Sequence, residues 1–306
     1  MIKPRSRWID TKVLRDFEAE GTDAHRLCTA AEAWIERFGR DILISYQREA
    51  TREQLLNELA RWSKEEHFQF DRIFGRFLPR QSATRETPHL LAGDLGDNLR
   101  TIVNERELRF GIDFGTGYSV GLFLDQRENR SYARKVAPDR LLNCFCYTCS
   151  FSVAAAAAGA QTVNIDVSKK SLARGRENFA LNGLRLTDHR FIPDDARSVL
   201  PRLARRGEKF DMIILDPPTF ARAPRGKAFR AESDLGDLLR AALEIAGHET
   251  RILVSTNCAT LDADALEKMT RHCLKRSGRA GGFHRQPQPI DFPAGTGAST
   301  IWLSLR

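Results

Sequence analysis

The second half of the chain alternates short apolar runs with stretches of helical pattern, and this alternation restricts the fold more than any other feature. The apolar runs cover residues 141–146, 162–165, 212–215 and 252–255, and the helical stretches cover 150–158, 169–181, 234–246 and 262–275. Strands separated by helices of this length pair in parallel through right-handed crossovers. We therefore predict a doubly wound, Rossmann-like α/β sheet over residues 125–306, with 300–305 as one more strand.

A small α/β domain is predicted to precede this sheet, over residues 24–106. We expect strands near 41–46 and 71–77 with a helix over 52–62 between them. The helix is indicated by apolar side chains at helical spacing, namely Leu55, Leu56, Leu59 and Trp62.

Two further segments flank the small domain. Residues 1–23 are charged and have few apolar positions, so we expect a weakly packed arm or a short helix. Residues 107–124 contain two strand-like runs, 108–114 and 118–124, which glycines punctuate. This pattern predicts a β-hairpin that links the two domains.

Composition narrows the choice of partners and location. The net charge of +8 comes mostly from arginine, whose planar fork suits phosphate, so RNA is the expected partner. A generally basic proteome would produce the same charge. No run approaches the roughly 20 apolar residues of a membrane span, and residues 1–10 lack the apolar core of a signal peptide. We expect a cytoplasmic protein without a membrane segment.

The six cysteines do not form a disulfide framework. Cys144, Cys146 and Cys149 crowd one predicted strand and its turn, whereas the others lie far away in the sequence. Cys146 and Cys149 have C-x-x-C spacing, but no second pair or histidine cluster completes a zinc site. We expect reduced thiols and no metal.

Acidic residues follow the predicted strands, at the edge where open parallel sheets bind ligands. Asp166, Asp195 and Asp216 each come directly or shortly after an apolar run. An acid in the position of Asp166 can accept hydrogen bonds from both hydroxyls of a ribose. Asp195 is placed to meet an adenine amino group.

The sharpest motif is Asp216-Pro217-Pro218-Thr219-Phe220. Two prolines fix φ and remove two donors, which predicts a rigid turn with bare carbonyls at a strand end. Phe220 could stack on a base that has left its stack, as a base must before its edge can be methylated. A structural turn with a buried phenylalanine is the alternative reading.

With these motifs in place, residues 121–306 resemble the bacterial 23S ribosomal RNA methyltransferase family, whose members modify cytosine C5 or guanine N7. The resemblance is carried by residues 123–130, 142–148 and 216–220 together with Asp166 and Asp195. Residues 25–104 resemble the middle domain of that family more weakly, and its N-terminal RNA-binding PUA domain has no counterpart here. The resemblance implies a class I methyltransferase fold, S-adenosylmethionine as cofactor and ribosomal RNA as substrate.

The resemblance also implies the cofactor contacts. Asp125, Gln126 and Arg127 would border the methionine end of the cofactor, Asp166 would hold the ribose and Asp195 would face the adenine. The remaining implied contacts come from the first strand of the sheet, from its turn and from the position after Asp195: Asn143, Phe145, Tyr147, Thr148, Ser150 and Ala196.

One position departs from the family pattern. The turn after Tyr147 and Thr148 normally carries glycine, where this chain has Cys149 and Ser150. Glycine lets a backbone approach a ligand closely, so we expect the Cys149 side chain to crowd the cofactor.

The acceptor atom depends on residues 255–260. In the cytosine branch of the family a cysteine attacks C6 of the base. An ungapped alignment puts that cysteine at Thr256, two residues before Cys258. Thr256, where the cytosine branch has its cysteine, and Thr219 in the proline motif both favour the guanine branch. In that branch a ring nitrogen is itself the nucleophile, and the enzyme needs only to orient it. Cys258 remains a candidate nucleophile.

Basic residues after the motif are predicted to hold RNA phosphates: Arg222, Arg225, Lys227 and Arg230. Asn257 is a further candidate contact to the substrate, and a solvated loop is the alternative for the basic residues. Two other functions stay open: a catalytically impaired RNA-binding or assembly protein, and a methyltransferase with a non-RNA acceptor. The sequence leaves a homodimer open.

Overall fold

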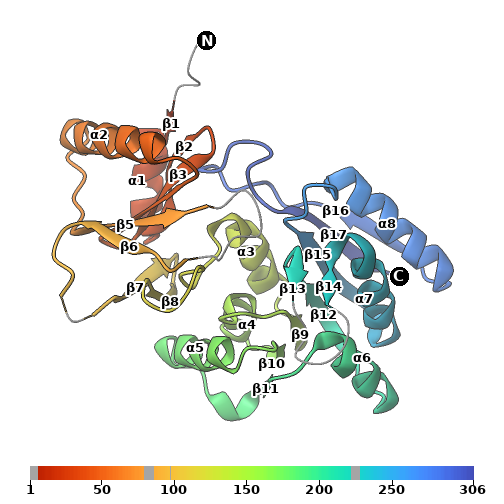
Figure 1. Ribbon diagram of the computed structural model, residues 1–306. Coiled ribbons are helices and arrows are strands. Elements are labelled where there is room, and N and C mark those ends of the chain that lie inside the picture. The colour runs from red at the N-terminus through yellow and green to blue at the C-terminus, as the bar shows by residue number, and fades with distance from the viewer. Residues whose placement is uncertain (1–5, 79–85, 97, 222–227) are drawn as a thin grey trace. The chain divides into compact units, whose positions relative to one another are not determined.

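The computed structural model describes residues 6–78, 86–96, 98–221 and 228–306 (Figure 1). It comprises two compact units. The first consists of Met1–Leu124 with Pro289–Pro293, and the second of Asp125–Gln288 with Ala294–Arg306. The first unit is therefore closed by a segment from near the C-terminus.

The second unit is built on a seven-stranded sheet with the order β11-β10-β9-β12-β15-β17-β16. Strands β11, β10, β9, β12 and β15 pair with one another in parallel, in this order. Strand β17 is antiparallel to both of its neighbours, β15 and β16. The bounds are β9 Arg140–Cys144, β10 Gln161–Ile165, β11 Arg190–Ile192, β12 Phe210–Leu215, β15 Ala246–Thr256, β16 Gly281–His284 and β17 Ser299–Leu305. The predicted doubly wound α/β fold is confirmed.

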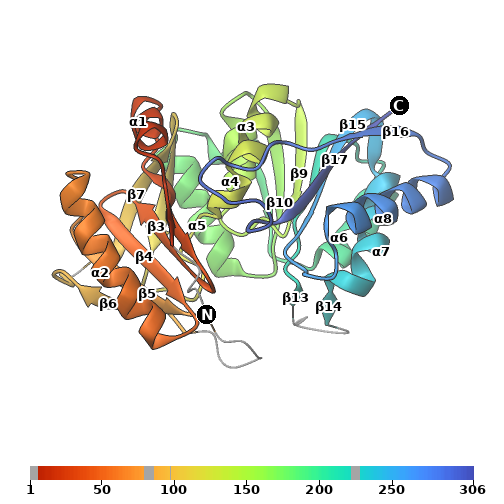
Figure 2. The ribbon, with the colours of Figure 1, turned by 90° about the horizontal axis from the view of Figure 1, so that it is seen from above.

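Helices cover both faces of this sheet, with α3, α4 and α5 on one side and α6, α7 and α8 on the other (Figure 2). Their bounds are α3 Arg127–Val136, α4 Ser150–Ala156, α5 Lys169–Leu181, α6 Ala196–Arg205, α7 Ala231–Glu244 and α8 Ala263–Arg276. Alternate strand residues supply the two cores: Leu141 and Ile214 pack with α3 and α4, and Leu142 and Ile213 pack with α6 and α7. This alternation explains why the central strands carry apolar side chains on both faces of the sheet.

The first unit contains a six-stranded sheet, β1 to β6 in sequence order, and a separate hairpin. The bounds are β1 Arg7–Trp8, β2 Ala24–Ala30, β3 Ala33–Phe38, β4 Asp41–Tyr46, β5 Arg72–Phe77, β6 His89–Ala92, β7 Arg100–Glu105, β8 Leu108–Asp113, α1 Thr11–Ala19 and α2 Glu49–Glu65. Helix α2 connects the parallel pair β4 and β5, as the sequence predicted. Both helices bury apolar side chains against the sheet, among them Leu14 and Leu59.

One prediction about the first unit was wrong, namely the hairpin over residues 107–124. Residues 118–124 form no strand, and the hairpin instead pairs β8 with β7. Its turn contains Arg106 with a φ of 57°, a conformation that glycine adopts more readily than other residues. Of the two alternatives predicted for the N-terminal segment, the short helix is confirmed by α1. This segment is not a weakly packed arm, because Phe17 is buried and Trp8 stacks on Trp62 with ring centroids 4.7 Å apart.

Candidate active site

The strand ends of the second unit bring the predicted acids to one edge of the sheet. Cys144 at the end of β9 pairs with Ile165 of β10 and with Leu215 of β12. The next residues along these strands, Asp166 and Asp216, therefore leave the sheet at the same level on either side of β9. Ligands of open parallel sheets bind at such an edge.

The loop after β9 is held in an unusual conformation by Asp166. Phe145, Tyr147 and Cys149 all have positive φ values, between 47° and 62°. The Tyr147 backbone N–H donates to Asp166 Oδ2 at 2.9 Å, and the Ser168 N–H donates to Asp166 Oδ1 at 2.8 Å. Burial raises the pKa of this carboxyl, and the two backbone N–H groups oppose that rise. Each carboxylate oxygen keeps a second lone pair for a ligand.

The packing of the Cys149 side chain does not support the expected crowding of the cofactor. Its side chain is fully buried, with Sγ 3.7 Å from Cys146 Sγ. A Cβ atom added to Gly175 of α5 would lie 2.5 Å from Cys149 Sγ. The thiol therefore occupies the space that this glycine leaves free and stays out of the solvent-facing edge.

Asp195 is already engaged by two groups of one residue, Arg197. Its side chain caps α6 by accepting the Arg197 backbone N–H at 2.9 Å. The Arg197 guanidinium also pairs with both carboxylate oxygens, at 2.6 Å for the shortest contact. A contact from Asp195 to adenine would share this carboxylate with Arg197, a residue that the sequence analysis did not single out.

The other predicted cofactor residues divide into two groups by exposure. Asp125, Phe145, Tyr147 and Ser150 are partly exposed, whereas the buried group consists of Gln126, Arg127, Asn143, Thr148 and Ala196. The buried members hold the loop and its neighbours together. Asn143 Nδ2 donates to Ser152 Oγ at 2.9 Å, and the Thr148 carbonyl accepts from Asn178 at 2.9 Å.

Asp216 lies at the end of β12 in a setting that disfavours its charge. Burial raises the pKa of this carboxyl from 3.8 to about 6, a hydrogen bond from Ser255 lowers it, nearby Asp125 raises it and Arg130 lowers it. Arg130 is itself buried, at 1% exposure. Asp216 could be identified from its position directly after a strand. Ser255 and Arg130 could not, because Ser255 lies within β15 and Arg130 lies within α3.

The aromatic side chain of the proline motif faces solvent. Phe220 is 48% exposed and begins the short strand β13 (Phe220–Ala221), which pairs with β14 (Phe229–Arg230). The Arg230 guanidinium lies over its ring, 5.3 Å from the centroid. These facts exclude the buried-phenylalanine alternative. The motif's carbonyls are not all bare, however, since Thr219 accepts a hydrogen bond from the Ala231 N–H at 3.0 Å.

The remaining predicted substrate residues fall into two groups. Arg222, Arg225 and Lys227 lie outside the described residues, so their phosphate contacts stay a prediction. Cys258 is only 8% exposed and packs in the core beneath α8, with its Sγ 3.2 Å from Thr260 Oγ1. Asn257, one residue earlier, is exposed.

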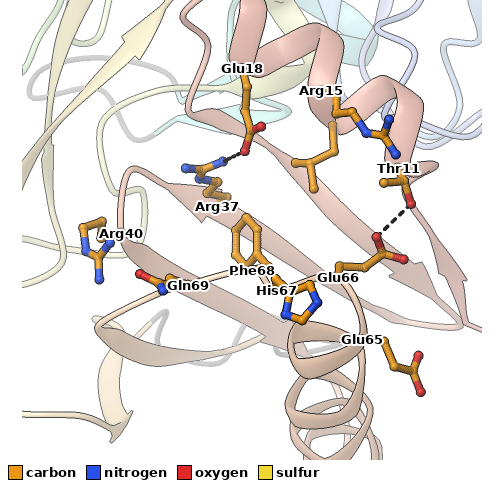
Figure 3. A pocket seen from close by; sticks show the side chains of 11 residues that line it. Thr11, Arg15, Glu18, Arg37, Arg40, Glu65, Glu66, His67, Phe68 and Gln69 are labelled. Atoms are coloured by element: carbon orange, nitrogen blue, oxygen red, sulfur yellow. Dashed lines mark hydrogen bonds and ion pairs between the residues drawn. The ribbon is translucent and has the colours of Figure 1, made fainter.

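A separate cavity of about 550 Å³ lies in the first unit, between α1 and the end of α2 (Figure 3). Its walls carry charges of both signs. Thr11 donates to Glu66 at 3.0 Å, and Arg37 lies 3.9 Å from Glu18. Because these groups face one another, and because none of the strand-end acids lines this cavity, we assign it no role in the reaction.

Two classes of feature were not found in the part of the chain that the structure describes. No helix there has the length and apolar character needed to cross a membrane. No group of three or more His, Cys, Asp or Glu side chains there is arranged to hold a metal ion.

Comparison with known proteins gives a consistent result. A family model described as S-adenosylmethionine-dependent methyltransferase matches residues 75–299. Ribosomal RNA large subunit methyltransferase I of Tolumonas auensis is 36% identical over 69% of this chain and 54% of its own length. The protein of the same name from Escherichia coli O139:H28 is 30% identical over 95% of this chain and 74% of its own. The chain spans about half the length of the first curated relatives that it matches.

Solved structures share the fold at lower identity. A protein crystallised with SAH superposes with a TM-score of 0.80 at 24% identity, covering 96% of this chain and 78% of the other. The SAM-dependent methyltransferase from Agrobacterium tumefaciens gives 0.70 at 20% identity, covering 93% and 90%. At these identities the likeness establishes the architecture.

Proposed function

Because the chain belongs to the family of S-adenosylmethionine-dependent methyltransferases, we propose that it transfers a methyl group to a base of ribosomal RNA. The observation that carries this proposal is the edge at which Asp166 and Asp216 leave the sheet at one level, beside an exposed aromatic ring at Phe220. The relatives' names supply the substrate class, and the basic charge of +8 suits it.

The residues at this edge fit S-adenosylmethionine. Asp166 retains a lone pair on each carboxylate oxygen for the ribose hydroxyls. Val167, the next residue, is 42% exposed and offers apolar surface beside it. Cys149 is enclosed against Gly175, which removes the reason to regard the chain as a catalytically impaired member of the family.

When bound, the cofactor supplies a methyl group on a positively charged sulfur. The work left to the protein is to present the base in the correct orientation. The exposed ring of Phe220 offers a stacking surface for an unstacked base. Asp216 offers a carboxylate that accepts a hydrogen bond from an amino group of the base, and Pro217 and Pro218 keep it at a fixed position.

We further propose a guanine ring nitrogen as the acceptor atom. A cysteine that attacks cytosine must reach the base, whereas Cys258 is buried in the core. A ring nitrogen needs no covalent catalyst, so the carboxylate, the aromatic surface and the nearby cofactor suffice.

The first experiment is calorimetric titration with S-adenosylmethionine. We expect micromolar binding to the wild-type protein and loss of at least about tenfold in affinity for Asp166→Ala, since ribose contacts of about 1.4 kcal/mol or more are removed. Absence of binding to the wild-type protein would refute the proposed cofactor site.

The second experiment measures transfer of a labelled methyl group to ribosomal RNA. We expect Asp216→Ala to lose transfer while Cys258→Ala retains most of it. Complete loss in Cys258→Ala, with cofactor binding intact, would instead indicate cytosine C5 as the acceptor.

A further inference from the structure

Four buried polar side chains of the second unit are linked in series and end at Asp216. Trp302 of β17 donates its indole N–H to Asn129 Oδ1 at 2.8 Å, and Asn129 Nδ2 donates to Gln126 Oε1 at 2.9 Å. Gln126 Nε2 then donates to Ser255 Oγ at 2.8 Å. Ser255 lies beside Asp216, because the residues before them, Val254 and Leu215, pair in the parallel register of β15 and β12, and the Ser255 hydroxyl lowers the pKa of Asp216. The four linking residues are at most 5% exposed.

The chemistry of the first group fixes the direction of the whole series. An indole N–H only donates, so the atom of Asn129 that faces Trp302 must be its oxygen. The Asn129 amide nitrogen must then face the oxygen of Gln126. The Gln126 nitrogen consequently donates to the Ser255 oxygen, and the Ser255 hydrogen is left for Asp216.

We propose that this directed chain of hydrogen bonds, which begins at Trp302 and ends at Ser255, positions the Asp216 carboxylate as an acceptor for the substrate. Trp302, Asn129, Gln126 and Ser255 are thus positioning residues rather than catalytic ones. The inference rests on the proposed function, since it takes Asp216 to contact the base.

The directed chain of hydrogen bonds stabilises the ionised form of Asp216 in surroundings that otherwise favour the protonated form. Burial and the nearby carboxylate of Asp125 both favour the protonated carboxyl, which would present a donor to the substrate. The charge of Arg130 and the Ser255 hydroxyl favour the ionised form. If Ser255 could turn its hydrogen toward Gln126, only Arg130 would stabilise the negative charge of Asp216. The directed chain of hydrogen bonds excludes that rotation, because the Gln126 nitrogen is already a donor to Ser255.

The test follows the Asp216 carboxyl by NMR titration of protein labelled with ¹³C-aspartate, with Asp216→Asn to identify its resonance. We expect the Asp216 pKa, about 6 in the wild-type protein, to rise by about 1 in Ser255→Ala, because a hydrogen bond to the charged form is lost. Trp302→Phe should shift it in the same direction by roughly half as much, because Asn129 and Gln126 become free to rotate. Leu303→Val is the matched control: it alters the adjacent buried residue, which packs in the other core, and should leave the pKa unchanged.

A rise in Ser255→Ala without any rise in Trp302→Phe would mean that Ser255 acts alone, and would overturn the directed chain. Should Trp302→Phe fail to fold, Asn129→Leu interrupts the series one step later and carries the same expectation.

A pH profile of methyl transfer separates this inference from the proposed function. We expect the acidic limb of the profile to move to higher pH with the Asp216 pKa in both Ser255→Ala and Trp302→Phe. If no ribosomal RNA accepts a methyl group but the carboxyl titration shifts as described, the proposed function fails and the directed chain stands. If the Asp216 pKa does not shift in Ser255→Ala, the directed chain of hydrogen bonds is refuted, whether or not the protein is active.

Discussion

Cys149 and Gly175 are complementary in size, and the departure of Cys149 from the family pattern has to be judged together with its partner. The left-handed conformation of Cys149, with a φ of 62°, is one that glycine adopts more easily. The thiol is accommodated because Gly175 leaves room on α5. The sequence showed that Cys149 departs from the family pattern. It did not show that Gly175 makes room for the thiol, because this contact depends on how α5 packs against the loop after β9.

We expect Gly175→Ala to destabilise the protein by about 1–3 kcal/mol through overpacking against the thiol. In a Cys149→Gly background the same change should be neutral or stabilising by up to about 1 kcal/mol, since alanine is the better helix former. Urea unfolding of the single and double variants provides the measurement. Additive effects of the two substitutions would contradict the proposed compensation.

The parallel strands of the second unit explain why so much of its site was predictable from the sequence. Apolar runs separated by helices dictate a common direction, and a common direction places Asp166, Asp195 and Asp216 at one edge. The linkage from Trp302 to Ser255 could not be predicted, because it depends on the antiparallel register between β15 and β17. The hairpin of β7 and β8 was missed because Arg106, rather than a glycine, takes the left-handed position.

The end of β12 should make stability depend on pH. The folded-state pKa of Asp216 is about 6, above its ordinary value of 3.8. Folding therefore favours the protonated carboxyl, and stability is lost as the pH rises from about 4 to about 6. Asp216→Asn should match the wild-type protein near pH 4 and exceed its stability at pH 8. The full shift corresponds to about 3 kcal/mol, and partial solvent contact should reduce the gain to roughly 1–2 kcal/mol. Thermal melts at both pH values test this, and an equal effect at both would contradict it.

At the scale of the whole molecule, the first unit is discontinuous in sequence. Pro289–Pro293 packs into it through Arg26, whose backbone N–H donates to Asp291 Oδ2 at 2.7 Å. The Arg26 guanidinium also lies 3.9 Å from the centre of the Phe292 ring. Arg26 and Asp291 are both buried.

Asp291→Ala should cost about 1–3 kcal/mol of stability, because it leaves the buried N–H of Arg26 without its side-chain acceptor. Asp71→Ala is the control: it removes an exposed ion pair with Arg40, at 2.6 Å, and should cost much less stability, because solvent screens an exposed pair. Chemical denaturation compares the two variants, and equal losses would show that the 289–293 segment contributes no more than a surface contact.

The placement of Pro289–Pro293 also bears on biosynthesis. A growing chain emerges from the ribosome with its N-terminus first, and its domains generally fold in that order. Here Arg26 waits for a segment that is translated 265 residues later, since it acquires Asp291 and Phe292 only when residues 289–293 have been made. The first unit is thus completed only after nearly all of the second unit has been synthesised.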